Sequence, residues 1–426
     1  MSAETNKPAF LPADILLPQN CNLTKWAVVA CDQYTSQPEY WQQVENYVGE
    51  APSALRMILP ESCLDGPNVE TDIVEINQTM TRYLRENRFR SLPGSFLYTE
   101  RLLRCGKTRC GLIGTVDLEQ YDYEPGATTK IRATEGTVLS RIPPRVAVRK
   151  NAPLELPHIL LLVDDVENTV IAPLAGEKKE MEQVYDFTLM ERSGDLMGWK
   201  LNEAQTKRVM DALDALSDPA AFNARYGTQD KAVLLFAVGD GNHSLATAKE
   251  CYERQKRITP QEQWAQLPSR YALVELTNLH DASLEFEAIH RVVFHVDPDS
   301  IISALVRYFP KAAKGGTQGH LLRYVHMHGE GTIAVPDPTH NLEVGTLQAF
   351  LDEYTSEHGG RIDYIHGEDV ARQLGAQNNN VAFLLPTLEK EQLFPTVMQD
   401  GVLPRKTFSM GEAHDKRFYM EARKIR

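Results

Sequence analysis

The fold follows most directly from residues 232–256, AVLLFAVGDGNHSLATAKECYERQK. Residues 232–238 form a continuous apolar run, which is typical of a central strand buried on both faces of a sheet. The run ends at Gly239, and the pattern predicts a helix that begins near Asn242 and continues to about Lys256. A buried strand that leads through a glycine-rich turn into a helix indicates an α/β protein.

The predicted turn, GDGNHS at residues 239–244, combines glycines with polar side chains. Glycine permits a tight turn, and backbone N–H groups at the start of a helix attract anions such as phosphate. Asp240 could bind a metal or act as a base, and His243 could donate to a phosphate or a carboxylate. A plain turn in which Asp240 caps the helix has the same pattern, so the spacing alone leaves both interpretations open.

The other hydrophobic patterns predict both strands and helices, so we expect a mixed α+β protein. An apolar strand over residues 26–31 ends at Asp32, and Ser36 is the predicted N-cap of a helix that extends to Tyr47. Residues 158–163 and 169–173 flank a polar segment and are expected to form a β-hairpin. The patterns before residue 281 also predict helices over 70–87 and from Asn202, and strands over 96–100, 109–116 and 270–277.

The chain has 426 residues, whereas a single core stops growing at about 250–300 residues. We therefore expect residues 1–280 to form an α/β core that carries the motif segments, and residues 281–426 to form a second α+β unit with a basic C-terminal motif. For the second unit, the patterns predict helices over 299–309 and 344–357 and strands over 321–328, 332–335, 361–365 and 381–386.

The composition argues against some classes of partner. The chain has 45 Lys and Arg against 58 Asp and Glu, and a net charge of −13 repels the phosphate backbone of nucleic acids. No apolar run approaches the roughly 20 residues of a membrane helix, and residues 1–18 lack a secretory signal. None of the six cysteines forms a CxxC pair. We therefore expect a cytoplasmic protein with reduced thiols and without a nucleic-acid or membrane partner, and the oligomeric state stays open.

Basic residues gather in two other segments. Arg132 and Glu135 are followed by three more arginines within residues 141–149, and such side chains could surround an anionic ligand, with Glu135 as a base or metal ligand. A solvated loop with scattered ion pairs is the alternative. The segment PRKTFS, residues 404–409, is compatible with phosphate binding and with an ordinary exposed tail.

Three histidines, His320, His326 and His328, raise the question of a metal site. No Asp, Glu or Cys completes a recognisable ligand set in the sequence, and no HExxH motif is present, so an exposed sheet face is the favoured interpretation. The sequence also lacks a Walker A motif, GxGxxG, a GxSxG elbow and the kinase HRD and DFG motifs. If the protein binds nucleotides, it does so without these common motifs.

Three segments together resemble a known family: ACDQYTSQPEYW at residues 30–41, RATE at 132–135 and GDGNHS at 239–244. They are similar, in order and spacing, to the bacterial and archaeal family called domain of unknown function 1015, and PRKT at 404–407 resembles its C-terminal motif. The central motif of that family is Asp-Gly-His-His-Arg. This chain keeps Asp240, Gly241 and His243 but has Asn242 and Ser244 at the other two positions, so any role of that arginine's charge is in doubt.

The Asp-Gly-His motif is in turn similar to one in the ParB/sulfiredoxin-like superfamily, where a strand–turn–helix unit holds nucleotide phosphates on the helix N-terminus. The resemblance implies a ParB/sulfiredoxin-like core, to which the C-terminal α+β unit is added. That superfamily includes kinases that phosphorylate free serine with an acidic residue as the base. The resemblance therefore connects the chain to serine metabolism, although fold-level similarity does not establish a function.

The leading hypothesis is a small-molecule phosphotransferase, a nucleotide-dependent kinase of free serine or of a similar anionic or amino-acid substrate, with ATP or ADP and Mg²⁺ as cofactors. Asp240 would hold the metal, His243 would contact a phosphate oxygen, and Asp32 or Glu135 would take the hydroxyl proton. The residues expected to bind phosphate or the substrate carboxylate are Gly239, Gly241, Asn242, Ser244, Arg132, Arg141, Arg145 and Lys406.

Two other functions remain open. A non-catalytic regulatory protein that binds a nucleotide or an amino acid would use the same anion site without a base, and the departures at Asn242 and Ser244 slightly favour it. A hydrolase of a phosphorylated metabolite would release phosphate without an acceptor. A ParB-like role in DNA binding fits least, because the net charge opposes it and no helix-turn-helix pattern is present.

Overall fold

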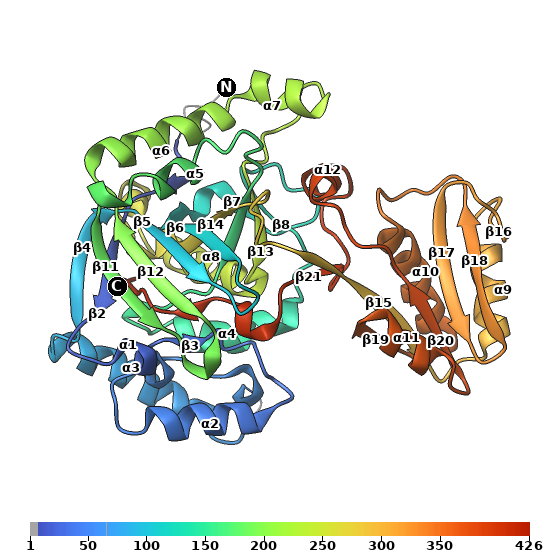
Figure 1. The fold of residues 1–426 in the computed structure, drawn as a ribbon, viewed down its shortest axis with the longest axis horizontal. Coiled ribbons are helices and arrows are strands. Elements are labelled where there is room, and N and C mark those ends of the chain that lie inside the picture. Colours follow the sequence, from blue (N-terminus) through green and yellow to red (C-terminus); the bar gives the residue numbers. More distant parts are fainter. Residues whose placement is uncertain (1–6, 65) are drawn as a thin grey trace. The chain divides into compact units, whose positions relative to one another are not determined.

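The computed structural model describes residues 7–64 and 66–426 (Figure 1). It has the mixed α/β fold that the sequence predicts, and it divides into two compact units. The first unit contains the described residues up to Ala133, together with Thr137–Leu284 and Glu412–Arg426. The second unit contains Thr134–Gly136 and Glu285–Gly411.

A mixed ten-stranded sheet forms the centre of the first unit. Its strands follow the order β11 (Glu182–Thr188), β12 (Asp195–Lys200), β5 (Leu97–Leu102), β6 (Thr108–Asp117), β14 (Tyr271–Asn278), β10 (Leu160–Val163), β13 (Phe236–Asp240), β8 (Ile131–Ala133) and β7 (Tyr121–Asp122), and β1 (Phe10–Leu11) pairs with β6. β13 is antiparallel to β10 and parallel to β8. The predicted buried strand therefore lies inside the sheet, with a neighbour on each side.

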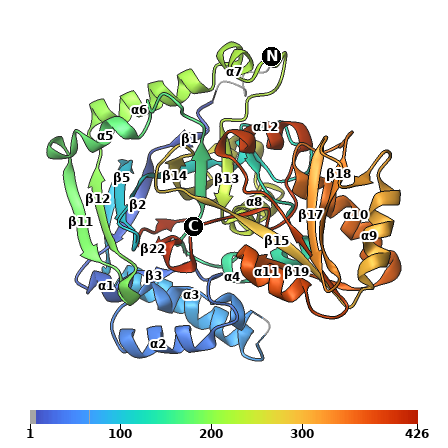
Figure 2. The same cartoon turned by 45° about the vertical axis from the view of Figure 1, so that its right-hand side comes forward.

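Helices of different lengths surround this sheet. They are α1 (Leu23–Trp26), α2 (Pro38–Val48), α3 (Val69–Arg85), α4 (Ile142–Arg149), α5 (Ala172–Ala175), α6 (Glu203–Leu216), α7 (Pro219–Tyr226) and α8 (Asn242–Lys256). Figures 1 and 2 show α2 and α3 at one end of the first unit and α6 and α7 at the opposite end. α8 has the bounds that the sequence predicts, and its Ala246 packs against Ile142 and Val146 of α4.

The C-terminal residues return to the first unit through short strand pairs. β22 (Phe418–Tyr419) pairs with β3 (Val28–Val29), and β23 (Arg423–Lys424) pairs with β9 (Leu154–Glu155). Elsewhere in the first unit, β2 (Ala13–Pro18) pairs with β4 (Phe89–Ser95). The structure thus differs from the expected division at residue 280, because the tail buries Phe418, Tyr419, Met420 and Ile425 in the core of the first unit.

A seven-stranded sheet organises the second unit. Its order is β16 (Ala313–Lys314), β18 (Gly329–Val335), β17 (His320–His326), β20 (Asn380–Leu384), β15 (Phe286–Phe294) and β19 (Arg361–His366), and β21 (Phe408–Met410) also pairs with β15. The helices are α9 (Pro298–Tyr308), α10 (Glu343–His358), α11 (Glu368–Gly375) and α12 (Lys390–Asp400). The strands and helices predicted beyond residue 298 are present, whereas β15 was not predicted.

Among the local predictions, the hairpin is wrong and the start of one helix is shifted. The expected hairpin does not form, because β10 lies between β13 and β14 and residues 172–175 form α5. Asp165 instead accepts a hydrogen bond from the backbone N–H of Val170 at 2.8 Å, which closes a turn after β10. The helix expected from Ser36 begins at Pro38, because the fixed φ of proline suits the first helical position.

None of the helices in residues 7–64 and 66–426 combines the length and the apolar character that a membrane span requires.

Candidate functional site

The turn from β13 into α8 places a glycine at the N-cap of the helix. Gly241 has a φ of +80°, and a Cβ at this position would lie 3.1 Å from the Cα of Ile159. Asp240 Oδ1 accepts a hydrogen bond from the N–H of Gly241 at 2.9 Å, so this carboxylate does not reach the helix as its cap. Since glycine has no side chain to cap the first turn, the N-terminus of α8 is suited to an anion.

We expect Gly241→Ala to lower the free energy of unfolding of the first unit by more than about 1–2 kcal/mol, the usual cost of a left-handed conformation without glycine. Gly227→Ala is the matched control, because Gly227 has a φ of +62° but no atom within 4 Å of its added Cβ. Urea unfolding gives the loss of unfolding free energy in each variant. The difference between the two losses measures the cost of the contact with Ile159. Equal losses would show that the turn has room for a side chain.

Asp240 forms an ion pair with Lys416 from the C-terminal tail. The Asp240 Oδ2 and Lys416 Nζ atoms are 3.3 Å apart, and both side chains are largely buried. Two buried arginines hold the backbone of this tail: Arg101 donates to the carbonyl oxygens of Lys416 and His414, and Arg109 donates to that of Asp415. Sequence reasoning missed Lys416, because no motif connects the tail with the glycine-rich turn.

Asp32 lies beside a histidine that sequence reasoning also missed. Asp32 Oδ2 is 3.6 Å from His158 Nε2, and the same nitrogen is 3.1 Å from Ser244 Oγ in the first turn of α8. His158 Nδ1 is hydrogen-bonded to the Tyr419 hydroxyl at 2.7 Å, and this hydroxyl accepts a hydrogen bond from the N–H of Cys31. The tail strand β22 supplies Tyr419, so it fixes the orientation of the imidazole.

The environment keeps Asp32 ionised and Cys31 protonated. Burial alone raises the pKa of Asp32, but His158, the hydrogen bond from Gln33 and Lys416 outweigh burial and leave the pKa below its ordinary value. Burial, followed by the Asp32 charge, raises the pKa of Cys31 to about 12. A proton acceptor therefore lies next to the α8 N-terminus, whereas the neighbouring thiol is not a thiolate nucleophile at neutral pH.

His243 is neutral at physiological pH. Burial, followed by the positive charges of Arg145 and Arg141, lowers its pKa to about 4. Its Nε2 accepts a hydrogen bond from the backbone N–H of Val138 at 3.2 Å. Because Nε2 accepts, the proton of the neutral ring is on Nδ1, and that N–H is the group with which His243 can donate to a ligand.

We expect the low pKa of His243 to weaken the first unit in mild acid. The unfolded chain binds this proton near pH 6.5 and the folded chain only near pH 4, so the free energy of unfolding falls as the pH decreases between these values. His243→Gln should flatten that decline in urea unfolding measured from pH 7 to about pH 4. His358→Gln, a change at an exposed histidine, is the control, and an unchanged slope in His243→Gln would refute the assignment.

Two predicted arginines lie near this cluster. Arg145 on α4 forms an ion pair with Glu61, with Nη2 and Oε2 2.8 Å apart, and Arg141 Nη1 is 3.7 Å from the same carboxylate. The side chain of Arg141 is 53% exposed, whereas that of Arg145 is 17% exposed. Both contribute to the low pKa of His243, so their charges act at the start of α8.

The other predicted site residues have different surroundings. Arg132 is buried, and its guanidinium donates to the carbonyl oxygens of Thr129 and Ala232 at 2.8 and 3.0 Å, which ties β8 to the segment before β13. Glu135 and Lys406 both belong to the second unit, where Glu135 Oε1 accepts a hydrogen bond from the backbone N–H of Lys406 at 3.0 Å. The first unit brings together the remaining predicted residues: Asp32, Arg141, Arg145, Gly239, Asp240, Gly241, Asn242, His243 and Ser244.

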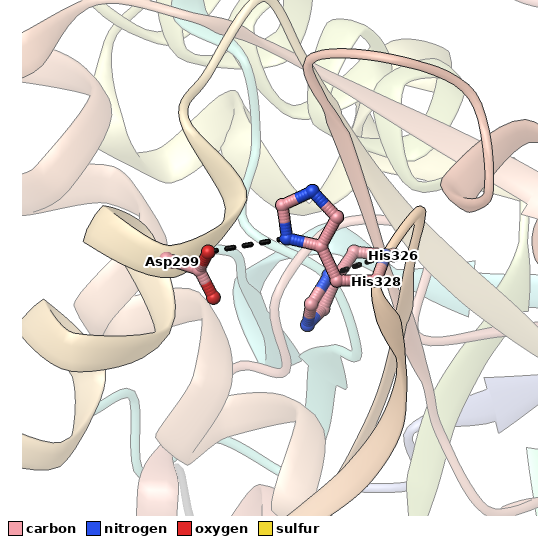
Figure 3. A group of neighbouring side chains, drawn as sticks. All are labelled: Asp299, His326 and His328. Carbon is pink, nitrogen blue, oxygen red and sulfur yellow. Dashed lines mark hydrogen bonds and ion pairs between the residues drawn. The ribbon is translucent and has the colours of Figure 1, made fainter.

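A separate group of potential metal ligands lies in the second unit, where Asp299 is next to His326 and His328 (Figure 3). One potential ligand atom of each residue lies within 4.8 Å of the others. The N–H of His328 donates to His326 Nδ1 at 3.2 Å, so Nε2 is the ligand atom that His326 can offer. Asp299, in the first turn of α9, supplies the acidic residue that the sequence did not reveal. Two imidazoles and a carboxylate suit Zn²⁺, but the Asp299 and His328 side chains are 65% and 54% exposed, as in a surface ion pair.

Comparisons with known proteins identify a family. The family model described as "Protein of unknown function (DUF1015)" matches residues 14–354, and no curated protein matches the chain. Solved structures similar to it include a free serine kinase variant in complex with AMP, at 12% identity and a TM-score of 0.41 over 73% of this chain and 91% of that chain.

Two further solved structures are similar at the same level. A conserved hypothetical protein from Pyrococcus furiosus has 11% identity and a TM-score of 0.37, over 73% of this chain and 94% of that chain. SbnI with a C-terminal truncation, from Staphylococcus aureus, has 10% identity and a TM-score of 0.37, over 72% of this chain and 85% of that chain. Similarity this low does not assign an activity to the chain.

Proposed function

This chain belongs to the DUF1015 family of proteins of unknown function, and we propose that it is a small-molecule phosphotransferase with a nucleotide-binding site at the N-terminus of α8. One observation carries the proposal. Asp32, Arg145 and the pair Asp240 and His243 come from three segments that are far apart in the sequence, and they gather around one helix N-terminus in the first unit. Phosphoryl transfer depends mainly on positioning and charge neutralisation, and these groups supply both.

The first turn of α8 would bind phosphate through its backbone. Its N–H groups and the helix dipole favour an anion, and the Nδ1–H of neutral His243 adds a donor. Lys416 and Arg145 bring positive charge to the same place, although each is paired with a carboxylate in the free protein. A bound phosphate would compete for Lys416 and replace part of its ion pair with Asp240.

Asp240 is the residue that fits Mg²⁺. A carboxylate oxygen is the ligand that this ion prefers, and Mg²⁺ in nucleotide enzymes commonly takes one or two carboxylates together with phosphate oxygens. When bound, Mg²⁺ would neutralise charge on the transferred phosphoryl group. Lys416 would then leave Asp240 Oδ2 and become available to a phosphate oxygen.

Asp32 is the proposed base. The hydroxyl oxygen of the acceptor forms a bond to the terminal phosphorus of ATP or ADP, the bond from that phosphorus to the bridging oxygen breaks, and the shortened nucleotide leaves. The hydroxyl proton passes to Asp32, whose carboxylate is ionised at neutral pH. His158 holds this carboxylate beside Ser244. Free serine is the first acceptor to test, since the sequence resembles a superfamily that contains free-serine kinases.

Phosphorus NMR on the purified protein tests the reaction. With Mg²⁺, L-serine and either ATP or ADP, we expect a phosphomonoester signal that requires serine, together with loss of the terminal phosphate of the nucleotide. Samples without serine are the control, and Asp211→Asn, at an exposed ion pair, is a control variant. Free phosphate that appears without an acceptor would instead indicate a hydrolase.

A non-catalytic regulator is the second candidate, and the ion pair between Asp240 and Lys416 favours it. A protein that only binds a nucleotide needs no metal ligand, so Asp240 could remain paired with Lys416. This candidate predicts that ATP or ADP raises the melting temperature, with or without Mg²⁺, while the nucleotide stays intact in the same NMR samples.

A further inference from the structure

A cavity of about 150 Å³ opens beside the proposed site, inside the first unit. Its apolar wall comes from three segments: Met57, Ile58 and Leu59 before α3, Met80 on α3, and Val148, Ala152 and Leu154 from the end of α4 to the start of β9. A space of this volume can hold a molecule the size of benzene. The wall therefore suits a hydrocarbon group of about one ring.

Polar side chains of the proposed site also line this cavity. His158, which holds Asp32, and Ser244, in the first turn of α8, both belong to its lining. Glu61 and Arg145 form their ion pair in the same lining. An opposite-charge pair of this kind can bind a zwitterion, with the ligand's carboxylate on the guanidinium and its ammonium group on the carboxylate.

We propose that this cavity binds the apolar group of the phosphoryl acceptor, and that the acceptor is a β-hydroxy amino acid with a ring-sized hydrocarbon group. The inference rests on the proposed function. Free serine has one methylene between its polar groups, so it would leave the apolar wall uncovered. An acceptor with a ring can fill the cavity, place its ammonium and carboxylate on Glu61 and Arg145, and direct its hydroxyl toward Asp32.

The apolar wall of the cavity argues against a nucleobase packed on it. The ring nitrogens of a base need hydrogen-bond partners when they are buried, and a buried polar atom without a partner is costly. Met57, Leu59, Met80 and Ala152 offer no such groups. Two charged residues of the lining, Arg149 and Glu155, are already bonded to each other at 2.5 Å. A hydrocarbon ring has no polar atoms, so its burial does not leave a hydrogen-bonding group without a partner.

The chemical step is that of the proposed function with a larger acceptor. The β-hydroxyl oxygen bonds to the terminal phosphorus of ATP or ADP, and the bond from that phosphorus to the bridging oxygen breaks. Asp32 receives the hydroxyl proton. The products are an O-phosphorylated amino acid and the nucleotide shortened by one phosphoryl group.

Binding of threo-phenylserine and L-serine by isothermal titration calorimetry tests the proposal, because the two differ by a benzene ring. Burial of the ring should make phenylserine bind about 10- to 100-fold more tightly than serine. Ala152→Leu fills the cavity and should remove most of this difference. Val148→Leu is a milder filling variant in case Ala152→Leu does not fold, and Ala220→Leu, at an exposed alanine, is the control.

Three outcomes would overturn the proposal: equal affinities for the two amino acids, a difference that survives both filling variants, and displacement of phenylserine by adenosine, which would assign the cavity to the nucleobase. The phosphorus NMR assay separates this proposal from the proposed function. Phosphoserine formed by a protein that does not bind phenylserine refutes only the cavity assignment. Cavity-dependent binding of phenylserine without any phosphomonoester supports the cavity assignment and refutes the phosphotransferase.

Discussion

Replacement of Glu421 by glutamine is expected to lower the free energy of unfolding of the first unit by about 3 kcal/mol, the lower end of the range for breaking a buried ion pair. Glu421 is 1% exposed. It accepts hydrogen bonds from Arg417 at 2.6 Å and from the Tyr185 hydroxyl at 2.5 Å. Glutamine keeps the shape of the side chain but removes its negative charge. The buried guanidinium of Arg417 then has one carboxylate fewer beside it. Glu275, 3.4 Å from Arg417, keeps the loss from being larger.

Tryptophan fluorescence during urea unfolding measures this loss in the relevant unit. The four tryptophans of the chain, at positions 26, 41, 199 and 264, all belong to the first unit. Glu86→Gln is the control, because its ion pair with Arg88 lies at the surface and should contribute about 0–1 kcal/mol. Similar losses in the two variants would show that the network of Glu421, Arg417 and Tyr185 stabilises the fold no more than an ordinary surface ion pair does.

This network also explains why the C-terminal tail belongs to the first unit. Arg417 and Glu421 are buried charges of the tail that pair with each other, and Glu275 on β14 and Tyr185 on β11 provide their other partners. The carbonyl groups that Arg101 and Arg109 bind lie immediately before Arg417. If the tail is loosened, Lys416 and Tyr419 lose their positions beside Asp240 and His158.

The sequence predicts the element that carries the site better than it predicts the site itself. α8 has its predicted bounds, because a buried apolar run, a glycine-rich turn and a helix pattern are all local signals. The predicted strand over residues 26–31 is reduced to β3, since Trp26 ends α1. β15 was missed because its buried residues include His290 and Arg291, which interrupt the apolar pattern.

Tertiary contacts explain the remaining differences. Lys416, His158 and Tyr419 come from segments without a recognisable motif, and only folding brings them to the α8 N-terminus. A basic residue in the sequence also does not reveal whether it binds a ligand or stabilises the fold. Arg132 is buried and donates to backbone carbonyl oxygens. Glu135 and Lys406 come from two different motif segments and are neighbours, but they belong to the second unit.

Replacement of Asp32 by asparagine is expected to reduce kcat for phosphoryl transfer by at least about 100-fold, since general-base catalysis typically contributes 10²–10⁴-fold. Asparagine preserves the size of the side chain but cannot accept the hydroxyl proton. The Michaelis constants should change little, because nucleotide phosphate is bound by the α8 N-terminus and its cations. The low pKa of Asp32 also predicts that wild-type kcat stays level from pH 8 down to about pH 5, since protonation of this carboxylate would begin only at lower pH.

Glu135→Gln is the decisive comparison, because Glu135 is the other predicted base and lies in the second unit. Each variant is measured in the phosphorus NMR assay at saturating nucleotide and acceptor, with Asp211→Asn as the surface control. If Asp32 is the base, Asp32→Asn loses turnover but retains the rise in melting temperature on nucleotide binding, whereas Glu135→Gln keeps most of its activity. The reverse pattern would refute the role proposed for Asp32.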